Sequence, residues 1–199
     1  MEKRRALILG VTGQDGSYMA ELLLEKEYVV YGLIRRTSTA SLRNIDQFKD
    51  RLRLIPGDLC DQSSLDSALL VAGTQEVYNF AAQSYVAHSF QTPLLTGDTT
   101  GLGALRVFES VRTLASKARV YQASSSEQFG NPSVSPQDEL TPFQPISPYG
   151  CAKTFAHHCA VVYRHAYQLF ITCGIAFNHE SERRGAEFVT RKITQAVAK

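Results

Sequence analysis

The sequence of 199 residues is long enough to build one sizeable hydrophobic core. Hydrophobic residues make up 44% of it and charged residues 20%, a balance that excludes intrinsic disorder. The formal net charge of +2 comes from basic residues scattered along the chain, which argues against nucleic acid as a partner. No run approaches the roughly 18 apolar residues of a membrane span, and the short run 6–9 does not make a signal peptide. We therefore expect a soluble, cytoplasmic protein that does not bind membranes.

Short apolar segments alternate along the chain with segments of helical periodicity. We expect strands at residues 6–9, 28–34, 51–59, 76–82, 119–124 and 169–177, and helices at 17–26, 63–72, 93–115, 147–167 and from 188 onward. Ser63 is a candidate N-cap for the second helix, and Ser147 or Pro148 begins the fourth. Three glycines between residues 97 and 103 weaken the prediction for the first half of the long third helix.

This alternation predicts an α/β fold, a doubly wound parallel sheet of the Rossmann type with right-handed crossovers. We assign residues 1–177 to this Rossmann domain. Such sheets bind ligands at the carboxyl ends of their strands, and the motifs described next all fall at those ends.

The segment GVTGQDG lies between the first expected strand and the first expected helix. Its glycines allow a tight turn and let main-chain N–H groups approach a pyrophosphate at the helix N-terminus, although such a turn can also be purely structural. The candidate cofactor-binding residues of this loop are Gly10, Val11, Thr12, Gly13, Gln14, Asp15 and Gly16.

The second strand ends in Arg35 and Arg36, where an acidic residue would bind the ribose hydroxyls of NAD. Arginine suits the extra 2′-phosphate of NADP, so NADP is the expected cofactor; the alternative is a pair of solvated surface arginines. After the third strand, Asp58 and Leu59 are candidates for the adenine site, although aspartate at a strand end often only forms a turn.

Tyr149 and Lys153 are spaced i, i+4 in SPYGCAK, which puts both side chains on one face of the expected helix. A nearby ammonium lowers the pKa of a phenol, so Tyr149 would accept a proton from a substrate hydroxyl while hydride leaves the same carbon. The spacing alone is common by chance. Its combination with the glycine loop and with the hydroxyl-rich strand end SSSEQFG favours a catalytic interpretation.

These residues together resemble the extended short-chain dehydrogenase/reductase superfamily. The segments GVTGQDGSY, NFAAQSYV, YQASSSEQFG, TPFQPISPYGCAK and FNHESERRGAEFVTRKI are similar, more narrowly, to the GDP-mannose 4,6-dehydratase family. The resemblance covers almost the whole chain. It also implies that residues 1–177 are the NADP-binding Rossmann domain, that residues 178–199 start the substrate-binding part, and that the C-terminal substrate domain of that family is largely missing from these 199 residues.

The resemblance implies an NADP-dependent hydro-lyase of nucleotide-sugar metabolism, acting in GDP-fucose biosynthesis. GDP-D-mannose would be oxidised at C4, lose water across C5 and C6, and regain hydride at C6 to give GDP-4-keto-6-deoxy-D-mannose. Tyr149, helped by Lys153, would take the C4 hydroxyl proton, Ser125 would hydrogen-bond the C4 oxygen, and Glu127 would remove the C5 proton. The alternatives are a strand-end cap for Ser125 and a solvated loop residue for Glu127.

The same resemblance implies further binding residues and an assembly. Those expected at the cofactor are Phe80, Ala81, Ala82, Gln83, Ser84, Tyr149, Lys153, His179 and Arg184. Those expected at the nucleotide-sugar are Ser84, Ser125, Glu127, Tyr149, Asn178, Val189 and Lys192. A homo-oligomer, dimer or tetramer, is implied, with the segment after Arg35 reaching a neighbouring subunit. The remaining histidines and the cysteines lack metal-ligand spacing, so no metal is expected.

Two other functions stay open. One is a nucleotide-sugar epimerase or reductase that uses the same Tyr149–Lys153 pair and leaves the C6 hydroxyl in place. The other is a cofactor-binding protein without catalysis, because truncation of the chain would remove the lid of the substrate pocket.

Overall fold

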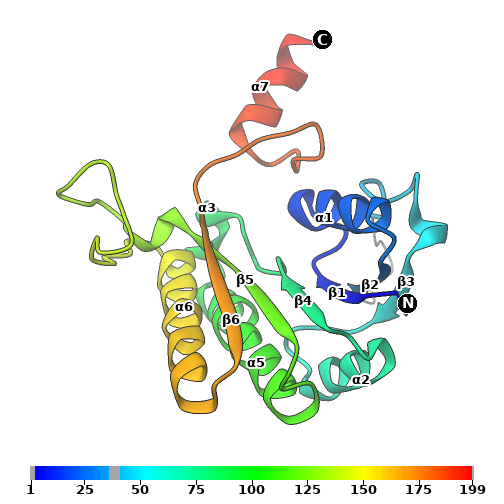
Figure 1. Ribbon diagram of the computed structural model, residues 1–199. Coiled ribbons are helices and arrows are strands. Elements are labelled where there is room, and N and C mark those ends of the chain that lie inside the picture. Colours follow the sequence, from blue (N-terminus) through cyan, green and yellow to red (C-terminus); the bar gives the residue numbers. More distant parts are fainter. Residues whose placement is uncertain (1–2, 36–40, 199) are drawn as a thin grey trace.

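The computed structural model describes residues 3–35 and 41–198 and shows one parallel sheet with helices on both faces (Figure 1). The strands are β1 (Arg5–Leu9), β2 (Val29–Ile34), β3 (Arg53–Pro56), β4 (Glu76–Asn79), β5 (Arg119–Ser125) and β6 (Phe170–Ala176). Their order is β3-β2-β1-β4-β5-β6, and every neighbouring pair is parallel. The expected doubly wound Rossmann fold is therefore confirmed, and its strand order reverses between β1 and β4.

The helices are α1 (Gln14–Glu25), α2 (Gln62–Ala72), α3 (Val86–Ser89), α4 (Pro93–Thr96), the π-helix η2 (Gly97–Leu102), α5 (Gly103–Leu114), α6 (Pro148–Tyr167) and α7 (Val189–Val197). Two 3₁₀ turns, η1 (Lys49–Arg51) and η3 (Ser126–Gln128), complete the elements. Helix α1 covers one face of the sheet, while α2, α5 and α6 cover the other (Figure 1). None of these helices is long and apolar enough to cross a bilayer.

Several boundaries differ from the sequence expectations. Helix α1 begins three residues early, at Gln14, because Gly13 in the glycine loop is already its N-cap. The expected strands 51–59 and 76–82 are shorter, since residues 57–59 and 80–82 leave the sheet. Ser63 is not the N-cap of α2: the carboxylate of Asp61 caps it and accepts a hydrogen bond from the Ser63 main-chain N at 3.0 Å.

The expected helix 93–115 is present as α4, η2 and α5, with the π-helix occupying its glycine-containing middle part. At the fourth expected helix, the Ser147 hydroxyl caps α6 by accepting from the Gly150 main-chain N at 3.0 Å, and Pro148 takes the first helical position. Both candidates for the start of that helix are therefore confirmed.

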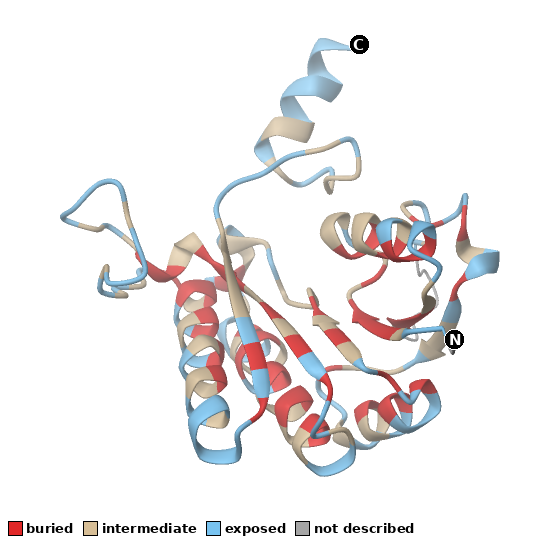
Figure 2. Cartoon of the chain, in the orientation of Figure 1, coloured by how far each residue is buried: buried red, intermediate tan, exposed pale blue. Residues whose placement is uncertain are grey.

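The core lies in two layers, one on each face of the sheet. Leu7 and Leu9 of β1 point into the layer shared with α2 and α5, whereas Ala6 and Ile8 point into the layer beneath α1. Since both faces of β1 are covered, the strand has a continuous apolar sequence rather than an alternating one. Figure 2 shows buried residues gathered in the central strands and on the sheet-facing sides of the helices. Each fully buried aliphatic side chain of this kind contributes about 1.5–3 kcal/mol.

Helix α7 differs from the other helices because it extends from the body of the domain (Figure 1). Val189, Ile193 and Val197 recur every four residues along it and are all exposed. The division between a cofactor domain ending at residue 177 and a substrate part beginning at residue 178 stays a prediction.

Candidate functional site

A cavity of about 1330 Å³ opens at the carboxyl ends of the strands. Residues that follow all six strands line it, among them Gly10, Arg35, Asp58, Phe80 and Glu127. This is where a doubly wound sheet binds ligands, and the volume exceeds the roughly 300–1,000 Å³ of an ordinary small-molecule pocket. The cavity is therefore large enough for a dinucleotide together with a second ligand.

The glycine loop brings the N-terminus of α1 close against the sheet. Gly10 has φ +83°, and a Cβ there would lie 2.8 Å from the Ala81 main-chain N. A Cβ at Gly16 would lie only 2.2 Å from the Gly10 carbonyl oxygen. Side chains are thus excluded where the loop turns, and Gln14, Asp15 and Gly16, in the first turn of α1, line the cavity. The N–H groups of a first helical turn have no partner within the helix. This arrangement fits a pyrophosphate.

Most cofactor candidates line this cavity. They are Gly10, Thr12, Gly13, Gln14, Asp15, Gly16, Arg35, Asp58, Leu59, Phe80, Ala81, Ala82, Ser84, Tyr149, Lys153, His179 and Arg184. Arg36 lies outside the described residues. Asp58 also has the turn-forming role considered from the sequence, because its carboxylate accepts from the Cys60 main-chain N at 2.9 Å.

Two cofactor candidates do not line the cavity. Val11 is wholly buried in the layer beneath α1, so its side chain is not available to a ligand. The Gln83 side chain donates from Nε2 to the Tyr85 carbonyl at 3.2 Å, and the Gln83 main-chain N donates to the Thr100 hydroxyl at 3.1 Å. A cofactor-binding role for these two residues stays a prediction.

The four catalytic candidates come together on one wall of the cavity. Ser125 ends β5 and Glu127 lies in η3. Tyr149 and Lys153 lie about one helical turn apart on α6. The Ser125 hydroxyl accepts from the Glu127 main-chain N at 3.2 Å, so Ser125 is also the strand-end cap considered from the sequence. Glu127 is half-buried and lines the cavity, and its alternative as a solvated loop residue stays open.

The electrostatics of Tyr149 differ from the expectation. Burial raises the pKa of its phenol, and a hydrogen bond with Ser125 only partly offsets this effect. The Lys153 ammonium donates to the Ala123 carbonyl at 2.8 Å and lies 5.7 Å from the centroid of the Tyr149 ring. Burial in turn lowers the pKa of Lys153 to about 8. The lowered phenol pKa expected from the sequence is therefore wrong.

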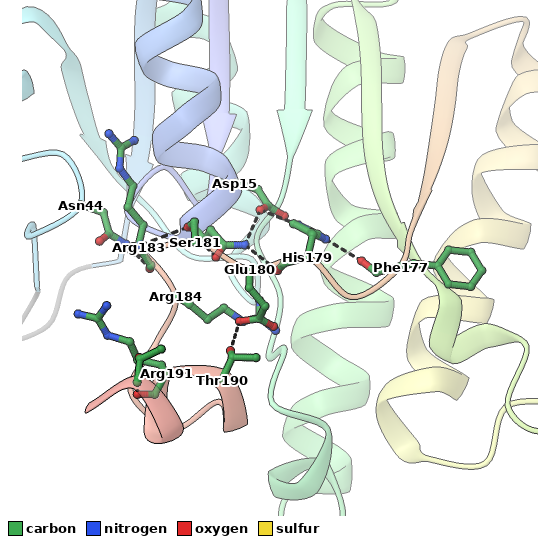
Figure 3. Close-up of polar contacts among 12 residues, drawn as sticks. Asp15, Asn44, Phe177, His179, Glu180, Ser181, Arg183, Arg184, Thr190 and Arg191 are labelled. Carbon is green, nitrogen blue, oxygen red and sulfur yellow. Dashed lines mark hydrogen bonds and ion pairs between the residues drawn. The ribbon is translucent and has the colours of Figure 1, made fainter. Parts of the chain in front are cut away.

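The loop after β6 contacts the glycine loop through His179 (Figure 3). Its Nδ1 lies 2.7 Å from the Phe177 carbonyl and its Nε2 lies 2.9 Å from the Asp15 carboxylate. Both ring nitrogens face acceptors, so the imidazolium form satisfies both contacts. Accordingly, the carbonyl contact and the carboxylate raise the pKa of His179.

Further contacts join the loop after β6 to helix α1. The Gln14 side chain donates to the His179 carbonyl at 3.2 Å, and Arg183 pairs with Glu21 at 2.7 Å. The Arg184 guanidinium lies 3.6 Å from the centroid of the Phe188 ring, directly before α7. Three substrate candidates in this region line the cavity: Asn178, Val189 and Lys192.

The sequence analysis missed several residues of the cavity wall. Tyr121 lines it two residues before Ala123 and four before Ser125, so the strand period alone would have placed it on the same face. Asn44 donates to the Thr12 and Arg183 carbonyls, which joins two loops that are distant in sequence. No local pattern marks that residue.

Within the described ranges, no cluster of three or more histidine, cysteine, aspartate or glutamate side chains could hold a metal ion. The cavity instead carries cations suited to phosphate groups. These are Arg35, Lys153, Arg183, Arg184 and Lys192.

Comparison with known proteins gives the family. Residues 7–199 match the family model described as GDP-mannose 4,6 dehydratase. A GDP-mannose 4,6-dehydratase of Vibrio cholerae is 48% identical over 207 residues, covering 100% of this chain and 56% of the relative. The human GDP-mannose 4,6 dehydratase is 47% identical over 204 residues, covering 98% of this chain and 55% of the relative. The chain thus spans about half the length of the relatives it matches.

Solved structures share the fold. A UDP-glucose 4-epimerase of Brucella ovis, in complex with NAD, is 28% identical with a TM-score of 0.79 and covers 88% of this chain and 52% of its own. A dTDP-glucose 4,6-dehydratase of Streptomyces venezuelae, solved with NAD bound, has a TM-score of 0.89 at 24% identity over 98% of this chain and 62% of its own. Since the family match extends over nearly every residue, the chain belongs to the GDP-mannose 4,6-dehydratase family.

Proposed function

We propose that this chain carries the cofactor site and the catalytic residues of an NADP-dependent GDP-mannose 4,6-dehydratase, a hydro-lyase. The observation that supports this most directly is the position of Glu127. Its carboxylate lines the same cavity as Tyr149, Ser125 and the glycine loop. Oxidation at one carbon needs only a hydride acceptor and a proton acceptor, whereas loss of water needs a further base at the neighbouring carbon.

When bound, a nicotinamide dinucleotide supplies the hydride acceptor for C4 and returns the hydride at C6. Tyr149 takes the proton of the C4 hydroxyl, and Ser125, already hydrogen-bonded to Tyr149, orients the C4 oxygen. The positive charge of Lys153 favours the phenolate that this step requires.

The C4 ketone then acidifies the C5 hydrogen, and the Glu127 carboxylate removes it as a proton. Glu127 passes this proton to the departing C6 hydroxyl, which leaves as water. Hydride enters at C6, and the proton that Tyr149 took balances the one that C5 regains. The product is GDP-4-keto-6-deoxy-D-mannose, and no cofactor is consumed.

NADP rather than NAD is proposed because Arg35 lines the cavity at the end of β2. Its guanidinium is suited to pair with a 2′-phosphate, and Arg36 follows it in the sequence. The substrate diphosphate would meet the cations near α7, among them Lys192, with Ser84, Asn178 and Val189 completing the wall.

The experiment is incubation of the chain with NADP+ and GDP-mannose, followed by mass spectrometry of the nucleotide-sugar. Loss of one water without net formation of NADPH is the expected result. A product of unchanged mass would instead support the epimerase alternative. Loss of two hydrogens from the sugar, with formation of one NADPH, would support the reductase, which with NADP+ runs in its oxidative direction. Binding of NADPH without any change of a nucleotide-sugar would support a cofactor-binding protein.

A homo-oligomer, dimer or tetramer, is also proposed from the family resemblance, and a cytoplasmic location is proposed from the sequence. Analytical ultracentrifugation of the chain and microscopy of a fluorescently tagged chain test them.

A further inference from the structure

Gln128 lies directly behind the catalytic residues and is wholly buried. Its side-chain oxygen accepts from the Ser124 hydroxyl at 2.9 Å, and its Nε2 donates to the Lys153 carbonyl at 2.9 Å. Its main-chain oxygen accepts from the Gln144 main-chain N at 2.9 Å. One residue therefore joins the end of β5, the loop before α6, and α6 itself.

The directions of these hydrogen bonds follow from the donors available. The Lys153 carbonyl is only an acceptor, so the Gln128 NH₂ group must face it and the Gln128 oxygen must face Ser124. The single hydroxyl hydrogen of Ser124 is then used on Gln128. His157 lies with Nδ1 2.9 Å from the same hydroxyl, so Nδ1 must carry a hydrogen and donate. The series of hydrogen bonds therefore runs from His157 to Ser124 and from Ser124 to Gln128, and the Gln128 amide N–H donates in turn to the Lys153 carbonyl.

A second contact ties the same 3₁₀ turn to α6. A Cβ at Gly150 would lie 2.6 Å from the Glu127 carbonyl oxygen, so the main chain of η3 packs directly on the first turn of the helix. The turn that carries Glu127 therefore contacts α6 at two points. The first is Gly150, which follows Tyr149 in the sequence, and the second is the Lys153 carbonyl, which accepts from Gln128.

We propose that Gln128 is a positioning residue whose buried amide holds η3 against α6, and so keeps the Glu127 carboxylate at a fixed place relative to Tyr149 and Lys153. The inference rests on the proposed function. Tyr149 and Lys153 stay on α6 without this amide, whereas Glu127 loses one of its two anchors. Removal of the amide is therefore expected to slow the C5 step far more than the C4 step.

Gln128→Met tests this, because methionine has similar length but none of the hydrogen bonds. The matched control is Gln62→Met: the Gln62 amide joins α2 to α5 by donating to the Arg106 carbonyl at 3.2 Å and to the Ser110 hydroxyl at 2.6 Å. In single turnovers of GDP-mannose with NADP+, NADPH absorbance reports C4 oxidation, and mass spectrometry reports water loss.

A displacement of about 1 Å costs on the order of a hundredfold in rate, so we expect water loss in Gln128→Met to fall by about ten- to a hundredfold and C4 oxidation by less than about threefold. NADPH then accumulates. Gln62→Met is expected to change the ratio of the two rates little. Equal loss of both steps in Gln128→Met, or no loss of either, would overturn the positioning role.

A second readout does not need turnover. The Glu127 charge contributes to raising the pKa of Tyr149, so Glu127→Gln should lower it in a titration of ¹³C-labelled tyrosine followed by NMR. Gln128→Met lets the carboxylate move, so the effect of Glu127→Gln on Tyr149 should be smaller in that background. An undiminished effect overturns the inference even if the parent chain does not dehydrate GDP-mannose, an outcome that would refute only the proposed function.

Discussion

Replacing Gly150 with alanine has two opposing effects on the free energy of unfolding: a gain in helix propensity and a steric collision. Alanine is better than glycine within a helix by about 0.5–1 kcal/mol. In this structure, however, the new Cβ would lie 2.6 Å from the Glu127 carbonyl oxygen and 3.0 Å from the Pro145 Cβ, against at least 3.4 Å for an ordinary contact. The turn η3 would have to move by about 0.8 Å, and overpacking of this kind costs about 1–3 kcal/mol.

The collision is therefore expected to outweigh the gain in helix propensity and to lower the free energy of unfolding by about 1 kcal/mol. For a chain of this size that corresponds to a fall in Tm of about 2–4 °C. The shift also moves Glu127, so water loss should decline more than cofactor binding. Differential scanning calorimetry measures the first effect and turnover of GDP-mannose the second.

Gly97→Ala is the matched control. Gly97 also has helical backbone angles, but a Cβ there would meet no atom within 4 Å. This variant should keep the full propensity gain and raise Tm by up to about 4 °C. An equal rise in Gly150→Ala would contradict the close approach of η3 to α6.

Three further predictions concern single charges. Arg35→Ala should weaken NADP+ binding about tenfold while sparing NAD+, as measured by fluorescence titration; equal losses would refute a 2′-phosphate contact. An NMR titration of Lys153 should show a midpoint near 8, and an ordinary lysine value would show that the ammonium is hydrated. Because the pKa of His179 is raised in the folded state, its stabilising contribution should be complete below its ordinary value and be lost as pH rises through the raised one. Urea unfolding at several pH values should show this loss, and His179→Gln should abolish it.

The order of strands and helices could be predicted from the sequence because parallel strands that are covered on both faces have continuous apolar sequences. The glycine loop and the Tyr149–Lys153 pair were accessible for a similar reason, since their function depends on local spacing. The cap of α2 was missed by two residues, because Asp61 and Ser63 are both good capping side chains and only the local geometry selects between them.

The contacts between segments that are distant in the sequence could not be predicted from the sequence. The His157 ring on α6 meets the Ser124 hydroxyl, 33 positions away. Asp15 and His179 are 164 positions apart. Nothing in a local pattern specifies such pairs, because they depend on how strands and helices pack. The Lys153 ammonium likewise binds the Ala123 carbonyl, a partner set by the approach of α6 to β5.

The most direct measurement of the central claim compares Glu127→Gln with the parent chain in deuterated water, using NADP+ and GDP-mannose. Glu139→Gln, which alters an exposed carboxylate away from the cavity, serves as the control. The parent chain and the control should form dehydrated sugar that carries deuterium at C5. Glu127→Gln should bind NADP+ as tightly as the parent and reduce it, but release no dehydrated sugar. Dehydration at the parental rate in Glu127→Gln would contradict the assignment of this carboxylate as the base at C5.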